Sequence, residues 1–95
     1  MTVHLGETIW LHEEIFDKDG ETPIDPDPDG NTIEVYDPEG NELAFTPTYT
    51  RLGVGVYEVK TQIPADAVAG TWRWKWTATI GGEPSVEWHH FEVEE

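Results

Sequence analysis

The stretch TWRWKWTATI, Thr71 to Ile80, decides the fold class of this 95-residue chain. Large apolar side chains alternate with polar ones, and this period of two is typical of a β-strand whose two faces differ. Trp72, Trp74 and Trp76 share one face, opposite the most concentrated basic residues of the chain. We interpret the three indoles as the buried wall of a β-sandwich. A flat aromatic platform for sugar rings is the alternative.

The same period recurs on both sides of this stretch. Alternating segments predict strands at Thr8–Phe16, Thr32–Tyr36, Glu42–Tyr49, Gly55–Pro64 and Ser85–Glu95. The sequence DPEGN, residues 37–41, is typical of a tight turn, since proline suits its second position and glycine supplies a positive φ. We therefore expect residues 32–49 to form a β-hairpin.

Six or seven strands separated by Gly, Pro and Asp turns at intervals near ten residues predict an all-β fold. We expect one domain, residues 1–95, folded as an immunoglobulin-like or fibronectin type III-like antiparallel β-sandwich of about seven strands. The chain has no cysteine, so it has no disulfide. The alternation predicts a core of Ile9, Leu11, Ile15, Ile33, Val35, Leu43, Phe45, Tyr57, Val59, Trp72, Trp74, Trp76, Phe91 and Val93.

The charge of the chain restricts its partners. Twenty acidic residues and five basic ones give a formal net charge of −15. Nucleic acid and anionic membrane are therefore not expected as partners, because both are bound through clustered lysine and arginine. An acidic, lysine-poor surface also fits a salt-rich cytoplasm. The first residues show no signal-peptide pattern, and no apolar run reaches the roughly 18 residues that span a bilayer.

The loop DPDPDG, residues 25–30, begins like a calcium-binding loop. An EF-hand starting at Asp25 needs a bidentate glutamate at its twelfth position, where this chain has Tyr36, so that assignment fails. We favour aspartates that form turns and cap backbone amides, and we expect no cofactor. A looser site for calcium or another hard cation stays open, shared among Asp25, Asp27, Asp29, Asp17 and Asp19.

The residue types needed for catalysis are sparse. His89 and His90 are consecutive, so in a strand they point to opposite faces and cannot bind one ion together. The single serine, Ser85, lies next to a turn, and there is no cysteine, no G-x-S-x-G motif and no phosphate-binding loop. We expect a protein that is not an enzyme.

Large aromatic residues are expected on the outside. If Ile9 and Leu11 point inward, then Trp10 and Phe16 point outward. If Phe91 points inward, Trp88 is buried only across a bulge. Exposed aromatic groups on a small acidic domain indicate an interface, so we predict partner binding through Trp10, Phe16 and Trp88. The alternative is a register shift that buries them.

The order of these motifs resembles the small immunoglobulin-like proteins in the structural gene modules of tailed bacteriophages and archaeal tailed viruses. Their layout is G-x-x-(strand)-D-x-D-G, D-P-x-G, G-x-Y, G-T-W-x-x-x-W and F-x-V. The corresponding residues are Gly6, Asp17, Asp19 and Gly20, then Asp37, Pro38 and Gly40, then Gly55 and Tyr57, then Gly70, Thr71, Trp72 and Trp76, and lastly Phe91 and Val93. The resemblance covers nearly the whole chain, and bacterial surface repeats share the same layout.

The resemblance implies a virion structural protein assembled in the host cytoplasm, either a capsid decoration or a head–tail accessory subunit. Its partners would be capsid or head–tail proteins, and it could form a homo-oligomer on the particle. It implies no catalytic residue. Its acidity would steer it towards basic or cation-loaded contacts. The alternative function is an adhesive or glycan-binding surface module.

Overall fold

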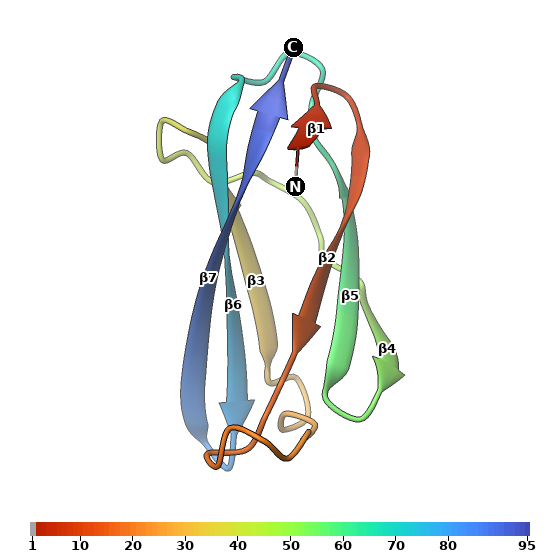
Figure 1. Ribbon diagram of the computed structural model, residues 1–95, viewed down its shortest axis with the longest axis vertical. Coiled ribbons are helices and arrows are strands. Elements are labelled where there is room, and N and C mark those ends of the chain that lie inside the picture. Colours follow the sequence, from red (N-terminus) through yellow and green to blue (C-terminus); the bar gives the residue numbers. More distant parts are fainter. Residues whose placement is uncertain (1) are drawn as a thin grey trace.

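The computed structural model describes residues 2–95 and shows an all-β protein built from two facing sheets (Figure 1). These residues contain no helix, and so none that could cross a membrane. The strands are β1 (Thr2–His4), β2 (Thr8–Glu14), β3 (Asn31–Tyr36), β4 (Tyr49–Gly53), β5 (Val56–Gln62), β6 (Gly70–Ile80) and β7 (Glu83–Glu94). The predicted β-sandwich character is therefore confirmed.

The two sheets have unequal numbers of strands. One has the order β1-β7-β6-β3, and the other has the order β2-β5-β4. The β6–β7 ladder runs without a break from the Gly70–Val93 pair to the Ile80–Glu83 pair. Because no bulge interrupts it, inward and outward positions alternate strictly along β7. The only parallel pair joins β1 to the end of β7, among the described residues.

The predicted hairpin over residues 32–49 is wrong. The turn itself forms, since the amide of Asp37 donates to the carbonyl of Asn41 and the amide of Leu43 donates to the carbonyl of Val35. Beyond it, residues 43–48 are not in a strand, and the chain crosses to the other sheet, where β4 pairs with β5. The neighbour of β3 is instead β6. The alternation was correct, but it carries no information about which strand is the partner.

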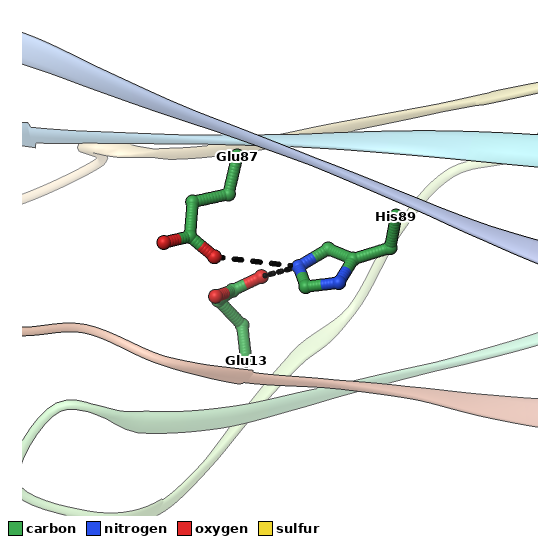
Figure 2. Close-up of side chains that lie close together, drawn as sticks. All are labelled: Glu13, Glu87 and His89. Carbon is green, nitrogen blue, oxygen red and sulfur yellow. Dashed lines mark hydrogen bonds and ion pairs between the residues drawn. The ribbon is translucent and has the colours of Figure 1, made fainter.

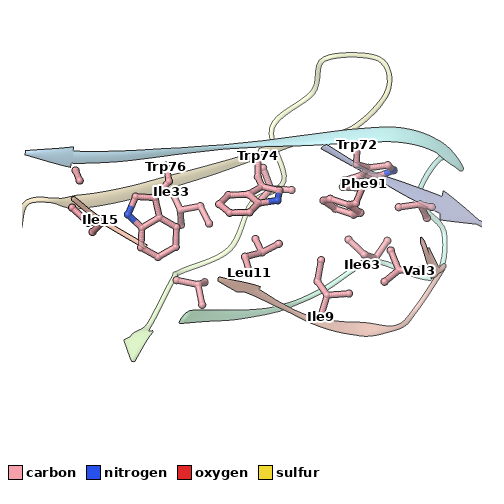
Figure 3. Close-up of a cluster of buried hydrophobic side chains, with 14 residues drawn as sticks. Val3, Ile9, Leu11, Ile15, Ile33, Ile63, Trp72, Trp74, Trp76 and Phe91 are labelled. Atoms are coloured by element: carbon pink, nitrogen blue, oxygen red, sulfur yellow. The ribbon is translucent and has the colours of Figure 1, made fainter. Parts of the chain in front are cut away.

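The core lies between the sheets, and the indoles of β6 form one wall of it (Figure 3). Trp72, Trp74 and Trp76 are buried, so the sugar-platform alternative is wrong for them. The other predicted core residues that prove buried are Ile9, Leu11, Ile15, Ile33, Val35, Val59, Phe91 and Val93.

Three predicted core residues are only half-buried and pack against the edge of the core. Leu43 and Phe45 lie in the crossing segment, where no ladder holds their side chains inward. Tyr57 lies near the β4–β5 turn and directs its hydroxyl to Asp25. The core also includes Val3, whose three-residue strand was not predicted, together with Ile63 and Ala78.

Candidate functional site

Three ionisable side chains meet between the two sheets. Glu13 comes from β2, and Glu87 and His89 come from β7 (Figure 2). Strand β2 is the outer strand of its sheet, and β7 has no neighbour on its outer side until Glu92, where β1 begins to pair. These two edges border an open side of the sandwich. We call the three residues the seam cluster.

The seam cluster is tightly spaced. Nε2 of His89 lies 3.0 Å from Oε2 of Glu13 and 3.5 Å from Oε2 of Glu87. The imidazole stacks on the indole of Trp74, with ring centroids 4.1 Å apart and planes at 20°. The glutamates also line a cavity of about 300 Å³, whose wall includes Trp76. The cluster is thus oriented by the core on one side and open on the other.

Glu13 is the buried member of the cluster. Its side chain is 6% exposed, whereas those of His89 and Glu87 are 38% and 62% exposed. Burial and the adjacent Glu87 carboxylate raise the pKa of Glu13 to about 8, because both disfavour its charged form. At neutral pH the protonated, neutral form of Glu13 is therefore favoured.

A second feature lies on the outer face of the four-stranded sheet. Trp88 is 51% exposed there, and its ring centroid is 5.8 Å from that of Tyr36. The guanidinium carbon of Arg73 lies 5.1 Å from the Trp88 ring centroid, and Nζ of Lys75 lies 5.6 Å from it. We call these four residues the Trp88 patch.

Glu34 contacts two of the four residues of the Trp88 patch. It forms an ion pair with Lys75 at 3.2 Å and accepts a hydrogen bond from the hydroxyl of Tyr36. This contact raises the pKa of Tyr36 to about 12, because the neighbouring carboxylate opposes loss of the phenolic proton. The patch is therefore preorganised, and it gathers two of the five basic residues of the chain.

The predicted partner-binding residues do not share one face. Trp10, Phe16 and Trp88 are all exposed, as the alternation predicted. However, Trp10 alternates with the buried Ile9 and Leu11 of β2, so it lies on the outer face of the three-stranded sheet, opposite Trp88. Phe16 follows β2 and lines the cavity beside the seam cluster. Of these three, only Trp88 has both an aromatic ring beside it and cations over its own ring among the described residues.

The structure does not assemble the predicted Asp-rich cation site. In residues 2–95, the one group of three ligating side chains within 4.8 Å is the seam cluster. Asp27 accepts hydrogen bonds from the amides of Gly81 and Gly82, both at 2.9 Å. The carboxylates of Asp17, Asp19 and Asp25 likewise accept hydrogen bonds from backbone amides, and Asp29 is exposed with a φ of 58°. Four of the five aspartates thus cap backbone amides, as we favoured, and the amides that Asp25 and Asp27 cap belong to distant loops.

Asp25 has the most contacts of these aspartates. Its carboxylate accepts hydrogen bonds from Nε and a terminal nitrogen of Arg51 at 3.1 and 3.0 Å, from the amide of Gly55 at 2.9 Å and from the hydroxyl of Tyr57 at 3.0 Å. These contacts, that of Arg51 above all, lower the pKa of Asp25 to about 2. Asp25 thus ties the long loop before β3 to the β4–β5 turn.

We expect Asp25→Asn to destabilise the protein in a pH-dependent way. A carboxylate whose pKa is lowered by folding stabilises the fold above its unfolded value of 3.8, and this stabilisation is lost as the pH falls through about 2. The difference in unfolding free energy between wild type and variant should therefore be full at pH 5 to 7 and shrink towards pH 2. Urea denaturation across this range measures it.

The exposed Asp66→Asn variant is the control for the loss of one negative charge. A wild-type–variant difference for Asp25→Asn that stayed constant from pH 7 to pH 2 would contradict the assigned role.

All three residues of the seam cluster were missed by the sequence analysis although a signal existed. Strict alternation from Ile9, Leu11 and Ile15 places Glu13 inward, and alternation from Phe91 places His89 and Glu87 inward. A glutamate at an inward position is unusual, because burying a charge without a partner is costly. Alternation could not show that β2 and β7 face each other across the open side of the sandwich.

Comparison with known proteins adds no family to this description. No family model matches the chain, and neither a curated protein nor a solved structure matches it.

Proposed function

We propose that the protein is a non-enzymatic binding module that attaches to a partner protein through the Trp88 patch. The observation that carries this proposal is a half-exposed indole in contact with Tyr36 and Arg73 on a strongly acidic protein. Tryptophan, tyrosine and arginine are the residue types most enriched at energetic hot spots of interfaces. Because the patch is already ordered, binding loses little side-chain entropy.

The proposed fold family is immunoglobulin-like, and the strand order supports it. If β2, β5 and β4 are named B, E and D, and β3, β6 and β7 are named C, F and G, the two sheets have the B-E-D and C-F-G orders of that family. Strand β1 would then correspond to the first strand, A, and it pairs with strand G. The absence of a disulfide is compatible with this arrangement, since aromatic packing fills the space between the sheets.

The proposed setting is a virion, as capsid decoration or as a head–tail accessory subunit. Its support is the order of motifs from Gly6 to Val93, together with the two-sheet fold and an ordered binding face. The genes that flank this one provide a test. Neighbours encoding capsid, portal or tail proteins are expected, whereas neighbours for secretion or cell-wall functions would contradict the virion setting.

Charge supports a partner surface with carboxylate and aromatic groups at the point of contact. Arg73 and Lys75 lie at the patch, although the chain as a whole carries −15. The overall field sets the rate of encounter and falls off over about 10 Å at 0.1 M salt, whereas the patch determines the contacts that form. The partner would therefore present acidic groups to the Trp88 patch, on a surface that is otherwise neutral or basic.

Trp88→Ala is expected to weaken partner binding at least tenfold without unfolding the protein. The indole is the centre of the patch, and truncation of a hot-spot residue costs about 2 kcal/mol or more. Binding of purified protein to assembled particles, or to the capsid and tail proteins encoded beside it, measures the effect. Circular dichroism checks that the fold is kept.

Trp10→Ala is the matched control, because Trp10 is 53% exposed and lies on the opposite outer face. It should leave affinity unchanged. If Trp10→Ala weakened binding and Trp88→Ala did not, the interface would lie on the three-stranded sheet and the proposal would be wrong.

A second candidate function is glycan binding, favoured by the tilted Tyr36–Trp88 pair at the surface. Aromatic pairs of this kind can stack against sugar rings. Titration with a broad panel of oligosaccharides should then change tryptophan fluorescence in the wild type but not in Trp88→Ala. A flat titration in the wild type would remove this candidate and leave the protein-binding proposal intact.

A further inference from the structure

The seam cluster supports an inference that is independent of the Trp88 patch. We propose that Glu13, Glu87 and His89 form a binding site for a divalent transition-metal ion, with Zn²⁺ as the test ion (Figure 2). The three side chains come from the two edges that border the open side of the sandwich. A bound ion would therefore link the two sheets.

The spacing of the atoms suits such an ion. Tetrahedral zinc with bonds of about 2.0–2.1 Å places neighbouring ligand atoms about 3.3 Å apart. Nε2 of His89 lies 3.0 and 3.5 Å from the nearest oxygens of Glu13 and Glu87. All three ligand atoms lie within 4.8 Å of one another. Small side-chain movements would bring them around one centre.

Both the imidazole and the buried carboxylate are prepared for a ligand. The stack on Trp74 fixes the plane of the His89 ring and directs Nε2 towards the glutamates. Glu13 is more than nine-tenths buried, and its Oε2 lies 3.0 Å from Nε2 of His89. Its side chain also lines the cavity beside the cluster, in which an ion would be bound.

The charge of the cluster points to a cation. Two carboxylates face one imidazole, and within residues 2–95 neither carboxylate forms an ion pair with lysine or arginine. With both glutamates bound as carboxylates, a divalent ion would balance their two negative charges. The attraction between the ion and the carboxylates is stronger where solvent is partly excluded than in bulk water.

The ligand types decide which ion fits. One imidazole nitrogen and two carboxylate oxygens suit zinc and its neighbours in the first transition row. Calcium prefers six to eight oxygen ligands, which this seam does not offer among the described side chains. Three protein ligands leave at least one position open, and the cavity lets water occupy it.

Calorimetric titration of metal-free, tag-free protein with zinc chloride tests the site. The buffer should contain about 0.15 M salt and excess Mg²⁺, so that diffuse association with the acidic surface is screened. We expect one ion per chain, and an increase in melting temperature of about 5 °C or more at saturation. His89→Gln and Glu87→Gln should each weaken binding by at least about tenfold.

The chain offers matched controls beside two of the three ligands. His90 and Glu14 are neighbours of His89 and Glu13 in sequence, but they are exposed and lie on the outer faces. His90→Gln and Glu14→Gln should bind zinc as the wild type does. Equal losses in the ligand variants and the control variants, or no saturable binding by the wild type, would overturn the proposal.

Discussion

Replacing Trp76 by alanine should lower the free energy of unfolding by about 4 kcal/mol, which is a large part of the stability of a small domain. Trp76 is 1% exposed, and its ring meets Tyr49 edge-on at 5.4 Å and Trp74 at 6.2 Å. Its Nε1 also donates to Oδ1 of Asn31 at 2.9 Å. Truncation removes these contacts and leaves a void beside the seam cavity.

Urea denaturation followed by far-UV circular dichroism measures this loss. Trp88→Ala makes the same change at an exposed position of the adjacent strand and should cost about 1 kcal/mol or less. If Trp76→Ala does not fold at all, Trp76→Phe keeps an aromatic ring in place, and it should lose about 1–2 kcal/mol because the hydrogen bond and part of the volume are gone. Equal losses for Trp76→Ala and Trp88→Ala would contradict the assigned core.

Gly55→Ala is the second change with a large expected effect. Gly55 has a φ of 71°, and an added Cβ would lie 2.5 Å from the carbonyl oxygen of Ile15 and 2.9 Å from the amide nitrogen of Ile24. Both are backbone atoms, and they lie where the segments around Ile15, Ile24 and Gly55 meet. The amide of Ile15 donates to the carbonyl of Gly55, and the amide of Ile24 donates to the carbonyl of Ile15. None of the three segments can move without breaking such bonds.

We expect Gly55→Ala to cost about 3 kcal/mol, of which about 1 comes from the left-handed backbone and about 2 from the collision. Gly20 separates the two causes, because its φ is 75° and nothing lies within 4 Å of its Cβ position. Gly20→Ala should therefore show the backbone cost alone. Thermal and urea denaturation of both variants measure the difference. Equal losses of stability in Gly55→Ala and Gly20→Ala would show that the collision at Gly55 is relieved without cost.

The sequence predicted the faces of the strands better than their neighbours. Alternation placed the indoles of β6 inward and Trp10 outward, because side-chain direction in a strand is a local property. It did not reveal that residues 43–48 leave the hairpin, since Leu43 and Phe45 alternate in the same way whether or not a partner strand is present. Strand β1 was missed because three residues are too few to show a period.

The candidate sites depended even more on long-range geometry. Glu13 and His89 are separated by 76 positions in the chain, and their contact exists only because β2 and β7 border the same open side. For the Trp88 patch, the alternation indicated exposure but not the Tyr36 and Arg73 neighbours, which come from β3 and β6. Conversely, the composition of the Asp-rich loops indicated a candidate cation site, whereas four of their five carboxylates accept hydrogen bonds from separate backbone amides.

The parallel pairing of β1 with the end of β7 has a mechanical consequence. Val3 pairs with Val93, and the amide of Leu5 donates to the carbonyl of Glu94, so β1 and the end of β7 lie side by side and run in the same direction (Figure 1). A force that pulls these ends apart would load the β1–β7 hydrogen bonds in shear, all together. Bonds loaded in this way resist extension more strongly than those of a hairpin that opens one pair at a time. A tensile load entering through both ends would therefore meet this short strand pair first.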